Sequence, residues 1–155
     1  MIMKRFLITN GAFSAGIRMF FLIFLLLIPS GLSAAVNGDI ILRIKNLKYK
    51  KGKILVALFQ SPEGFPGDDK QSVKSWVLEP GKEFVLQDIP PGRYALSVLH
   101  DTDGNLRMSS NILGIPKEGF GFSGREPSFL SFPDFKKSAF DHPAGGTVLE
   151  INLHY

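Results

Sequence analysis

Hydrophobic and polar residues alternate over short segments through most of this chain after residue 36. The alternation is clearest at the end, where Leu149, Ile151, Leu153 and Tyr155 make one face and polar residues the other. A period of two is that of a β-strand, and one wet face is typical of an antiparallel sheet. The apolar run Ile54–Phe59 has no polar face, which predicts a central strand covered on both sides.

Similar strand patterns recur between turns rich in Gly, Pro or Lys. They lie at residues 39–47, 73–78, 84–86 and 94–99. In the last of these, Tyr94, Leu96 and Val98 share the predicted core face. Pro133–Phe140 has helical spacing, with Pro133 at the first helical position. About seven short strands and one short helix predict an all-β fold, an antiparallel sandwich of immunoglobulin or transthyretin type.

The first 35 residues have a different pattern. Positive charges at Lys4, Arg5 and Arg18 precede an unbroken apolar run, Met19–Ile28, and small residues follow up to Ala35. This order predicts a secretory signal peptide over residues 1–35, cleaved near Ala35, and a periplasmic or extracellular location. A membrane span needs about 20 apolar residues, and the run Met19–Ile28 is about half that length. Once the signal peptide is removed, residues 36–155 form a single β-sandwich domain with no membrane span. The alternative is that the segment stays in place as an N-terminal anchor.

Composition changes the picture once this segment is removed. The chain has 18 Lys and Arg and 14 Asp and Glu, and three of the basic residues, but no acidic ones, lie in the first 35. The remaining segment therefore carries 15 minus 14, or +1, and this net charge does not favour binding to nucleic acid or to an anionic membrane. The absence of cysteine excludes disulfides, thiolate metal sites and a cysteine nucleophile.

Four motifs follow one another in the second half of the chain. They are PGRYA (Pro91–Ala95), HDTDGN (His100–Asn105), GIPKEGFGFS (Gly114–Ser123) and PDFKKSAF (Pro133–Phe140). Together they resemble the secreted bacterial domain-of-unknown-function 2141 family over most of residues 36–155. The Pro-Gly-x-Tyr turn also resembles that of transthyretin-like and collagen-adhesin B-type modules. The resemblance implies a secreted β-sandwich and no particular activity, because the family has none assigned.

The acidic loop after residue 100 is the first candidate for chemistry. Asp101, Asp103 and Asn105 alternate as oxygen ligands do at the start of a calcium loop. The glycine and glutamate that complete an EF-hand are missing further on. The resemblance also leads us to expect a carboxylate where Ser109 stands, and Arg107 opposes a cation. The alternative is a polar turn whose side chains cap their own backbone, and we expect weak calcium binding at most and no cofactor.

His100 is the second candidate, because an imidazole next to a carboxylate can take part in acid–base chemistry. One hypothesis is a small hydrolase or metal-dependent enzyme that uses His100, Asp101 and Asp103. The other is a partly buried histidine that hydrogen-bonds to loop carbonyl groups. The second is favoured, because adjacent strand residues point to opposite faces and no nucleophile is evident.

The same region also holds a cluster of phenylalanines: Phe120, Phe122, Phe129, Phe132, Phe135 and Phe140. If exposed they form a partner surface, and if buried they form a satellite core, which is the favoured interpretation. Within this region the residues assigned to a ligand or partner surface are His100, Lys117, Glu118, Phe120 and Phe122.

Two functions from different classes follow. The first is a non-catalytic module that binds an unknown protein or glycan of the cell envelope through the loops after Leu99. The second is the small hydrolase or metal-dependent enzyme. The first is favoured, because no triad, carboxylate pair or metal set can be assembled from the sequence.

Overall fold

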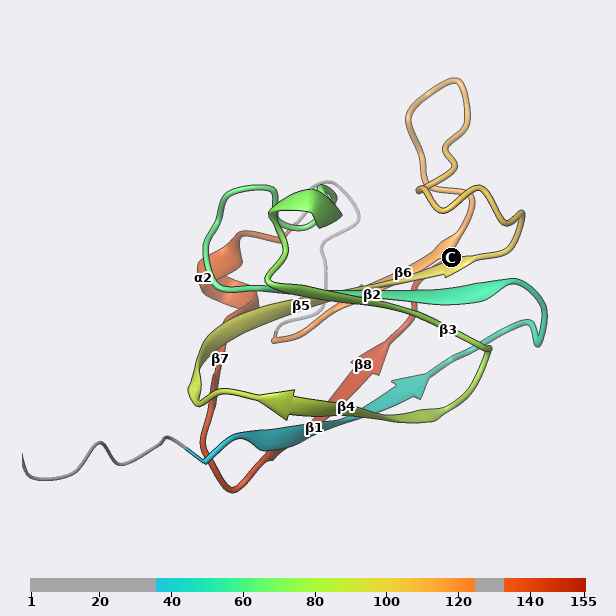
Figure 1. Ribbon diagram of the computed structural model, residues 1–155. Coiled ribbons are helices and arrows are strands. Elements are labelled where there is room, and N and C mark those ends of the chain that lie inside the picture. The colour runs from blue at the N-terminus through green and yellow to red at the C-terminus, as the bar shows by residue number, and fades with distance from the viewer. Residues whose placement is uncertain (1–35, 125–132) are drawn as a thin grey trace, which may run out of the picture. The chain divides into compact units, whose positions relative to one another are not determined.

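A computed structural model describes residues 36–124 and 133–155 of the chain. The predicted signal peptide, together with Phe129 and Phe132, lies outside the described residues. The described residues belong to one compact unit. In the described part of this unit, eight strands form a two-layered sandwich (Figure 1). The prediction of an all-β sandwich with one short helix is confirmed.

The two sheets differ in size. The smaller has the order β4-β1-β8, with β1 at Gly38–Lys45, β4 at Glu83–Ile89 and β8 at Thr147–Asn152. The larger has the order β3-β2-β5-β6, with β2 at Lys53–Phe59, β3 at Lys74–Leu78, β5 at Gly92–Asp101 and β6 at Gly119–Phe122. The short strand β7 (Phe140–His142) pairs with the start of β5. A 3-10 helix, η1, spans Asp69–Gln71, and helix α2 spans Phe135–Ser138.

The core fills the space between the two sheets. It takes alternate residues of the long strands, such as Ile40 and Leu42 of β1 and Leu96 and Val98 of β5. All the residues of this buried cluster lie between Ile40 and Leu153, so residues 36–155 hold a core of their own. The predicted core face of β5 is confirmed: the Tyr94 ring is buried, and its hydroxyl donates to the carbonyl of Pro90 at 2.9 Å.

The direction of the last strand corrects the prediction. β8 pairs with β1 in parallel, from Ile40 opposite Thr147 to Lys45 opposite Asn152. The other strand pairs are antiparallel. Alternation of buried and exposed side chains belongs to the strand itself and carries no information on the direction of its neighbour. The strand was therefore located by its pattern, but its orientation was not.

Two strands were missed in the sequence. β7 is too short, at three residues, to show a pattern. β6 has the sequence Gly-Phe-Gly-Phe, which reads as a loop because glycine weakens strands. Its glycines allow close packing: a Cβ at Gly119 would lie 2.5 Å from the Tyr155 ring, and one at Gly121 would lie 2.6 Å from Ile151. Only glycine fits where β6 passes over the C-terminal segment.

Helix α2 begins two residues later than expected, at Phe135 and not at Pro133. Asp134 is the N-cap, and its carboxylate accepts a hydrogen bond from the amide of Lys136 at 3.1 Å. Pro133 therefore precedes the cap and does not occupy the first helical position. Among the described residues, no helix combines the length and the apolar character needed to cross a membrane.

Candidate functional site

Strand β5 ends in two fully buried polar residues, His100 and Asp101. The Nε2 atom of His100 lies 2.9 Å from the carbonyl oxygen of Lys51, and Nδ1 lies 2.7 Å from the hydroxyl of Tyr155. A carbonyl only accepts, so Nε2 carries a proton and donates to it; when the ring has no second proton, Nδ1 accepts from the hydroxyl. The Tyr155 oxygen in turn accepts from the amide of Lys48 at 3.2 Å. His100 thus ties β5 to the β1–β2 turn and to the C-terminal residue.

Burial also affects the Tyr155 hydroxyl itself. Desolvation raises the pKa of Tyr155, while the hydrogen bond from the Lys48 amide opposes this shift. The phenol therefore stays protonated and can donate to His100 near neutral pH.

Asp101 turns away from His100 and binds the loop that follows. Its two oxygens accept from the backbone amides of Gly104 at 2.8 Å and Leu106 at 2.9 Å. His100 and Asp101 therefore have different partners, which agrees with the divergence expected of neighbouring strand residues.

Glu118, at the other end of the loop, is also buried. One of its oxygens accepts from the amide of Thr102 at 2.7 Å, and the other accepts from the amide of Ser109 at 3.0 Å. The sequence assigned Glu118 to an exposed surface, but the structure places its carboxylate inside. Burial without hydrogen bonds would be costly for this group, and the two backbone amides offset that cost.

The side chain of Asp103 is exposed, unlike those of Asp101 and Glu118. One oxygen accepts from the Asn105 amide at 3.1 Å, and the other accepts from the Ser109 hydroxyl at 2.8 Å. These hydrogen bonds, that from Ser109 foremost, lower the pKa of the Asp103 carboxyl. The side-chain amide of Asn105 also donates to Asp103, at 3.0 Å.

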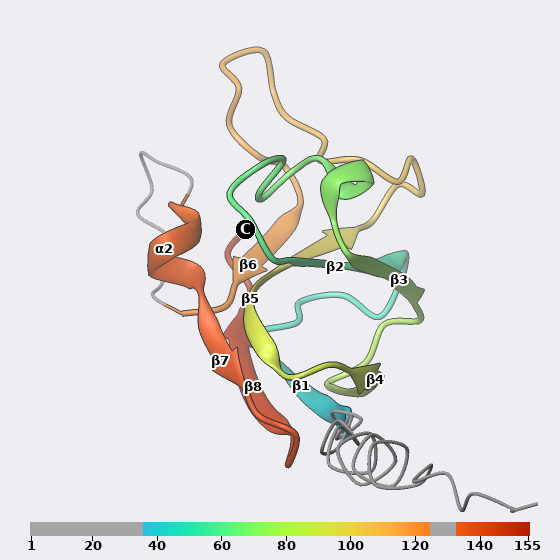
Figure 2. The same ribbon diagram turned by 60° about the vertical axis from the view of Figure 1, so that its left-hand side comes forward.

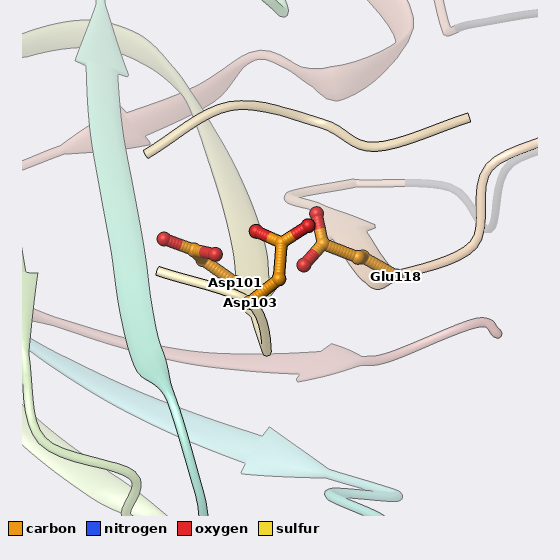
Figure 3. Close-up of side chains that lie close together, drawn as sticks. All are labelled: Asp101, Asp103 and Glu118. Atoms are coloured by element: carbon orange, nitrogen blue, oxygen red, sulfur yellow. The ribbon is translucent and has the colours of Figure 1, made fainter. Parts of the chain in front are cut away.

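The three carboxylates converge at the base of the β5–β6 loop, which spans residues 102–118. One oxygen from each of Asp101, Asp103 and Glu118 lies within 4.8 Å of the others. Figure 3 shows Asp103 between the other two, with its carboxylate turned toward Glu118. The sequence named Asp101, Asp103 and Asn105, so the structure supplies a third carboxylate that was not expected. The pairing of β5 with β6, which sets His100 opposite Gly119, brings Glu118 there.

We call Asp101, Asp103 and Glu118 the carboxylate clamp. Carboxylate oxygens are suited to a hard cation such as calcium, and these three residues are the ones that could hold it. The clamp already accepts hydrogen bonds from five backbone amides, those of Thr102, Gly104, Asn105, Leu106 and Ser109. Its evident role is to fix the base of the loop.

Above the clamp, the β5–β6 loop projects from the sandwich. In Figures 1 and 2 it rises farther from the sheets than the other described loops. Asn111 orders its tip, because its side-chain oxygen accepts from the amides of Leu113 and Ile115, both at 2.9 Å. The apolar side chains of the tip nevertheless face solvent: Ile112 is fully exposed and Leu113 is 78% exposed. Sequence reasoning missed this surface, although the run Ile112-Leu113-Gly114-Ile115 was its signal.

The residues assigned to a partner surface are scattered. His100, Glu118 and Phe122 are buried, so these three side chains form no exposed partner surface. Burial was the favoured interpretation for His100 and Phe122, whereas for Glu118 it was not expected. Phe120 is half-buried, with its ring centroid 6.2 Å from that of His154, and Lys117 is exposed.

Phe122 is part of a satellite cluster of aromatic rings on the outer side of the larger sheet. Phe65 packs edge-on against Phe59, Phe122 and Phe135, with ring centroids 5.4 to 6.0 Å apart. The two other histidines also lie inside the domain. His142 is buried in β7, and the Nε2 atom of His154 is buried with no hydrogen-bond partner among the described residues.

A family model described as an uncharacterized protein conserved in bacteria (DUF2141) matches residues 42–150, from β1 to β8. The chain belongs to this family. The match confirms the resemblance seen in the four motifs, and it includes both sheets, the clamp and the β5–β6 loop. No curated protein and no solved structure matches the chain. Membership of DUF2141 assigns no activity, so function must be inferred from the site.

Proposed function

We propose that this DUF2141 protein is an exported, non-catalytic binding module that contacts its partner through the tip of the β5–β6 loop. The observation that carries this proposal is the exposure of Ile112 and Leu113 on an ordered, projecting loop. Exposed apolar side chains that gather on one surface mark sites of interaction. The clamp supports this role, because a fixed base presents the tip with little loss of loop entropy on binding.

The side chains of the tip indicate which kind of partner it binds. The sequence predicts a protein or glycan of the cell envelope. Sugars stack on flat aromatic rings that can also hydrogen-bond at their edge, and the tip between Leu106 and Lys117 has no aromatic residue. Aliphatic side chains instead fit an apolar surface, such as a pocket on a protein. The proposal is therefore a partner with an apolar surface.

The alternative, a small hydrolase using His100, Asp101 and Asp103, has less support. Both ring nitrogens of His100 are engaged inside the protein. Both oxygens of Asp101 bind backbone amides. A general base needs a basic atom within reach of a substrate, and neither residue offers one at the surface.

Export rests on the pattern of residues 1–35. We place cleavage near Ala35 and the mature domain in the periplasm or outside the cell. Strand β1 begins at Gly38, so removal of residues 1–35 leaves the two sheets intact.

The test is site-specific photo-crosslinking in cells that export the protein. A photoreactive residue replaces Ile112 in one variant and Val148 in a control. Val148 lies on β8 and is 56% exposed, so it reports on contacts elsewhere on the surface. We expect a defined adduct from position 112 and none from position 148. No adduct with either protein or lipid from position 112, or the same adducts from both positions, would rule out the tip as the binding surface.

A further inference from the structure

Positive charges flank the apolar side chains at the tip of the β5–β6 loop. Residues 104–117 include Arg107 and Lys117, both exposed, and no Asp or Glu. The two cations flank the exposed run from Ile112 to Ile115. An apolar tip flanked by charge of one sign is thus presented on the loop that projects farthest among the described loops (Figures 1 and 2).

A second basic segment lies beside the base of this loop. The β1–β2 turn carries Lys48, Lys50 and Lys51, which are exposed and form none of the ion pairs found among the described residues. The turn is adjacent to the end of β5, because the Lys51 carbonyl binds His100 and a Cβ at Gly52 would lie 2.0 Å from the carbonyl oxygen of Asp101.

Charge is therefore unevenly distributed over the domain. Five cations, Lys48, Lys50, Lys51, Arg107 and Lys117, belong to two segments that leave the same end of the paired strands β2 and β5. The exposed acid in these two segments is Asp103. Glu79, which follows β3 at the same end of the sheet, is paired with Lys53. The net charge of +1 for residues 36–155 hides this concentration, so it is a poor guide to what this end of the domain attracts.

We propose that this end of the domain docks on an anionic lipid surface. Ile112, Leu113 and Ile115 enter the boundary between headgroups and acyl chains, as the apolar faces of interfacial segments do. Arg107 and Lys117 lie at headgroup depth, and the lysines of the β1–β2 turn add long-range attraction to the anionic surface. This inference rests on the proposed function and names the partner of the same loop.

A lipid surface fits these features better than a protein pocket. Arg107 and Lys117 lie on both sides of the tip and form no ion pair in the part of the chain that the structure describes, so both charges are available to an extended anionic surface. Ile112 and Leu113 are neighbours in the chain and both are exposed, so a planar surface can contact both. A protein that binds the tip in a pocket is the competing partner, and the experiment below distinguishes the two.

The test is co-sedimentation of residues 36–155 with vesicles. One set contains phosphatidylglycerol and phosphatidylcholine, and the other contains phosphatidylcholine alone. We expect binding at least tenfold tighter to the anionic vesicles, weakening as salt is added. Replacement of Ile112 and Leu113 by Ser lowers binding tenfold or more. The Arg107→Gln/Lys117→Gln variant lowers binding to anionic vesicles about fivefold for each charge removed.

Matched variants control for the loss of apolar surface or charge anywhere on the domain. Val77→Ser/Val148→Ser removes exposed apolar residues elsewhere, and Lys70→Gln/Lys136→Gln removes exposed lysines elsewhere. Neither control is expected to change binding by more than twofold. An unchanged melting temperature shows that each variant is folded.

Absence of binding to anionic vesicles, or equal binding by the tip variant, would overturn the lipid proposal. Equal binding to both vesicle types would overturn the role of the cations. If the domain does not bind anionic vesicles and position 112 crosslinks to a protein, the lipid proposal is wrong and the proposed function stands. If the domain does not bind anionic vesicles and position 112 crosslinks to nothing, both proposals are wrong.

Discussion

At the scale of single residues, this domain uses buried polar groups to hold its backbone. His100 is the clearest case, because each ring nitrogen holds a different segment. We expect His100→Ala to lower the free energy of unfolding by about 1–3 kcal/mol, since Lys51 and Tyr155 lose buried partners. Chemical denaturation measures this change. If the variant kept its melting temperature but lost an enzymatic turnover present in the wild type, the histidine would be catalytic and the binding module excluded.

Asp103 gives a prediction about pH. The hydrogen bond from Ser109 is the main cause of the lowered pKa of Asp103. A carboxyl with a lowered pKa in the folded state adds stability above its unfolded pKa of about 3.9, and this stability is lost as pH falls through the folded pKa. Ser109→Ala should therefore raise the pKa of Asp103 toward its ordinary value. NMR titration of the Asp103 carboxyl measures it, and an unchanged pKa would show that the bond to Ser109 does not form.

At the scale of elements, periodicity was a good guide where strands are long. The alternation in β1, β5 and β8 and the apolar run of β2 predict these strands from the sequence. It failed for β6, because the glycines that weaken its strand signal are required by the close approach of Tyr155 and Ile151. A contact between distant segments cannot be read from a local pattern.

The carboxylate clamp was only partly predictable for the same reason. Asp101 and Asp103 are close in sequence, and their alternation pointed to a common site. Glu118 reaches them through the pairing of β5 with β6, and that pairing was not predicted. The apolar tip was visible as a short run, but its exposure depends on how the clamp and Asn111 hold the loop.

The clamp also gives a prediction about calcium. Calcium prefers six to eight oxygen ligands, and this clamp offers three carboxylates that are already bonded to backbone amides. We expect a dissociation constant of about 10⁻⁴–10⁻³ M or weaker, as in weak extracellular sites. Calorimetry of wild type, Asp101→Asn and the control Asp69→Asn measures it. Micromolar affinity that is lost only in Asp101→Asn would contradict this expectation.

At the scale of the whole molecule, the chain divides into an N-terminal segment with a secretory pattern and a domain with a complete core. We expect export with cleavage after Ala35, which leaves a chain that begins at Val36. The intact mass of the protein recovered from outside the cytoplasm measures the cleavage point. A full-length product in the membrane fraction would show that the segment is retained as an anchor.

The central claim is that the tip of the β5–β6 loop is the binding surface of this domain. Its most direct test is sedimentation of residues 36–155 with isolated cell-envelope fragments, comparing wild type with Ile112→Ser/Leu113→Ser. The Val77→Ser/Val148→Ser variant is the control. We predict binding by the wild type and the control, and binding at least tenfold weaker by the tip variant at an unchanged melting temperature. Equal binding by all three proteins would contradict the claim.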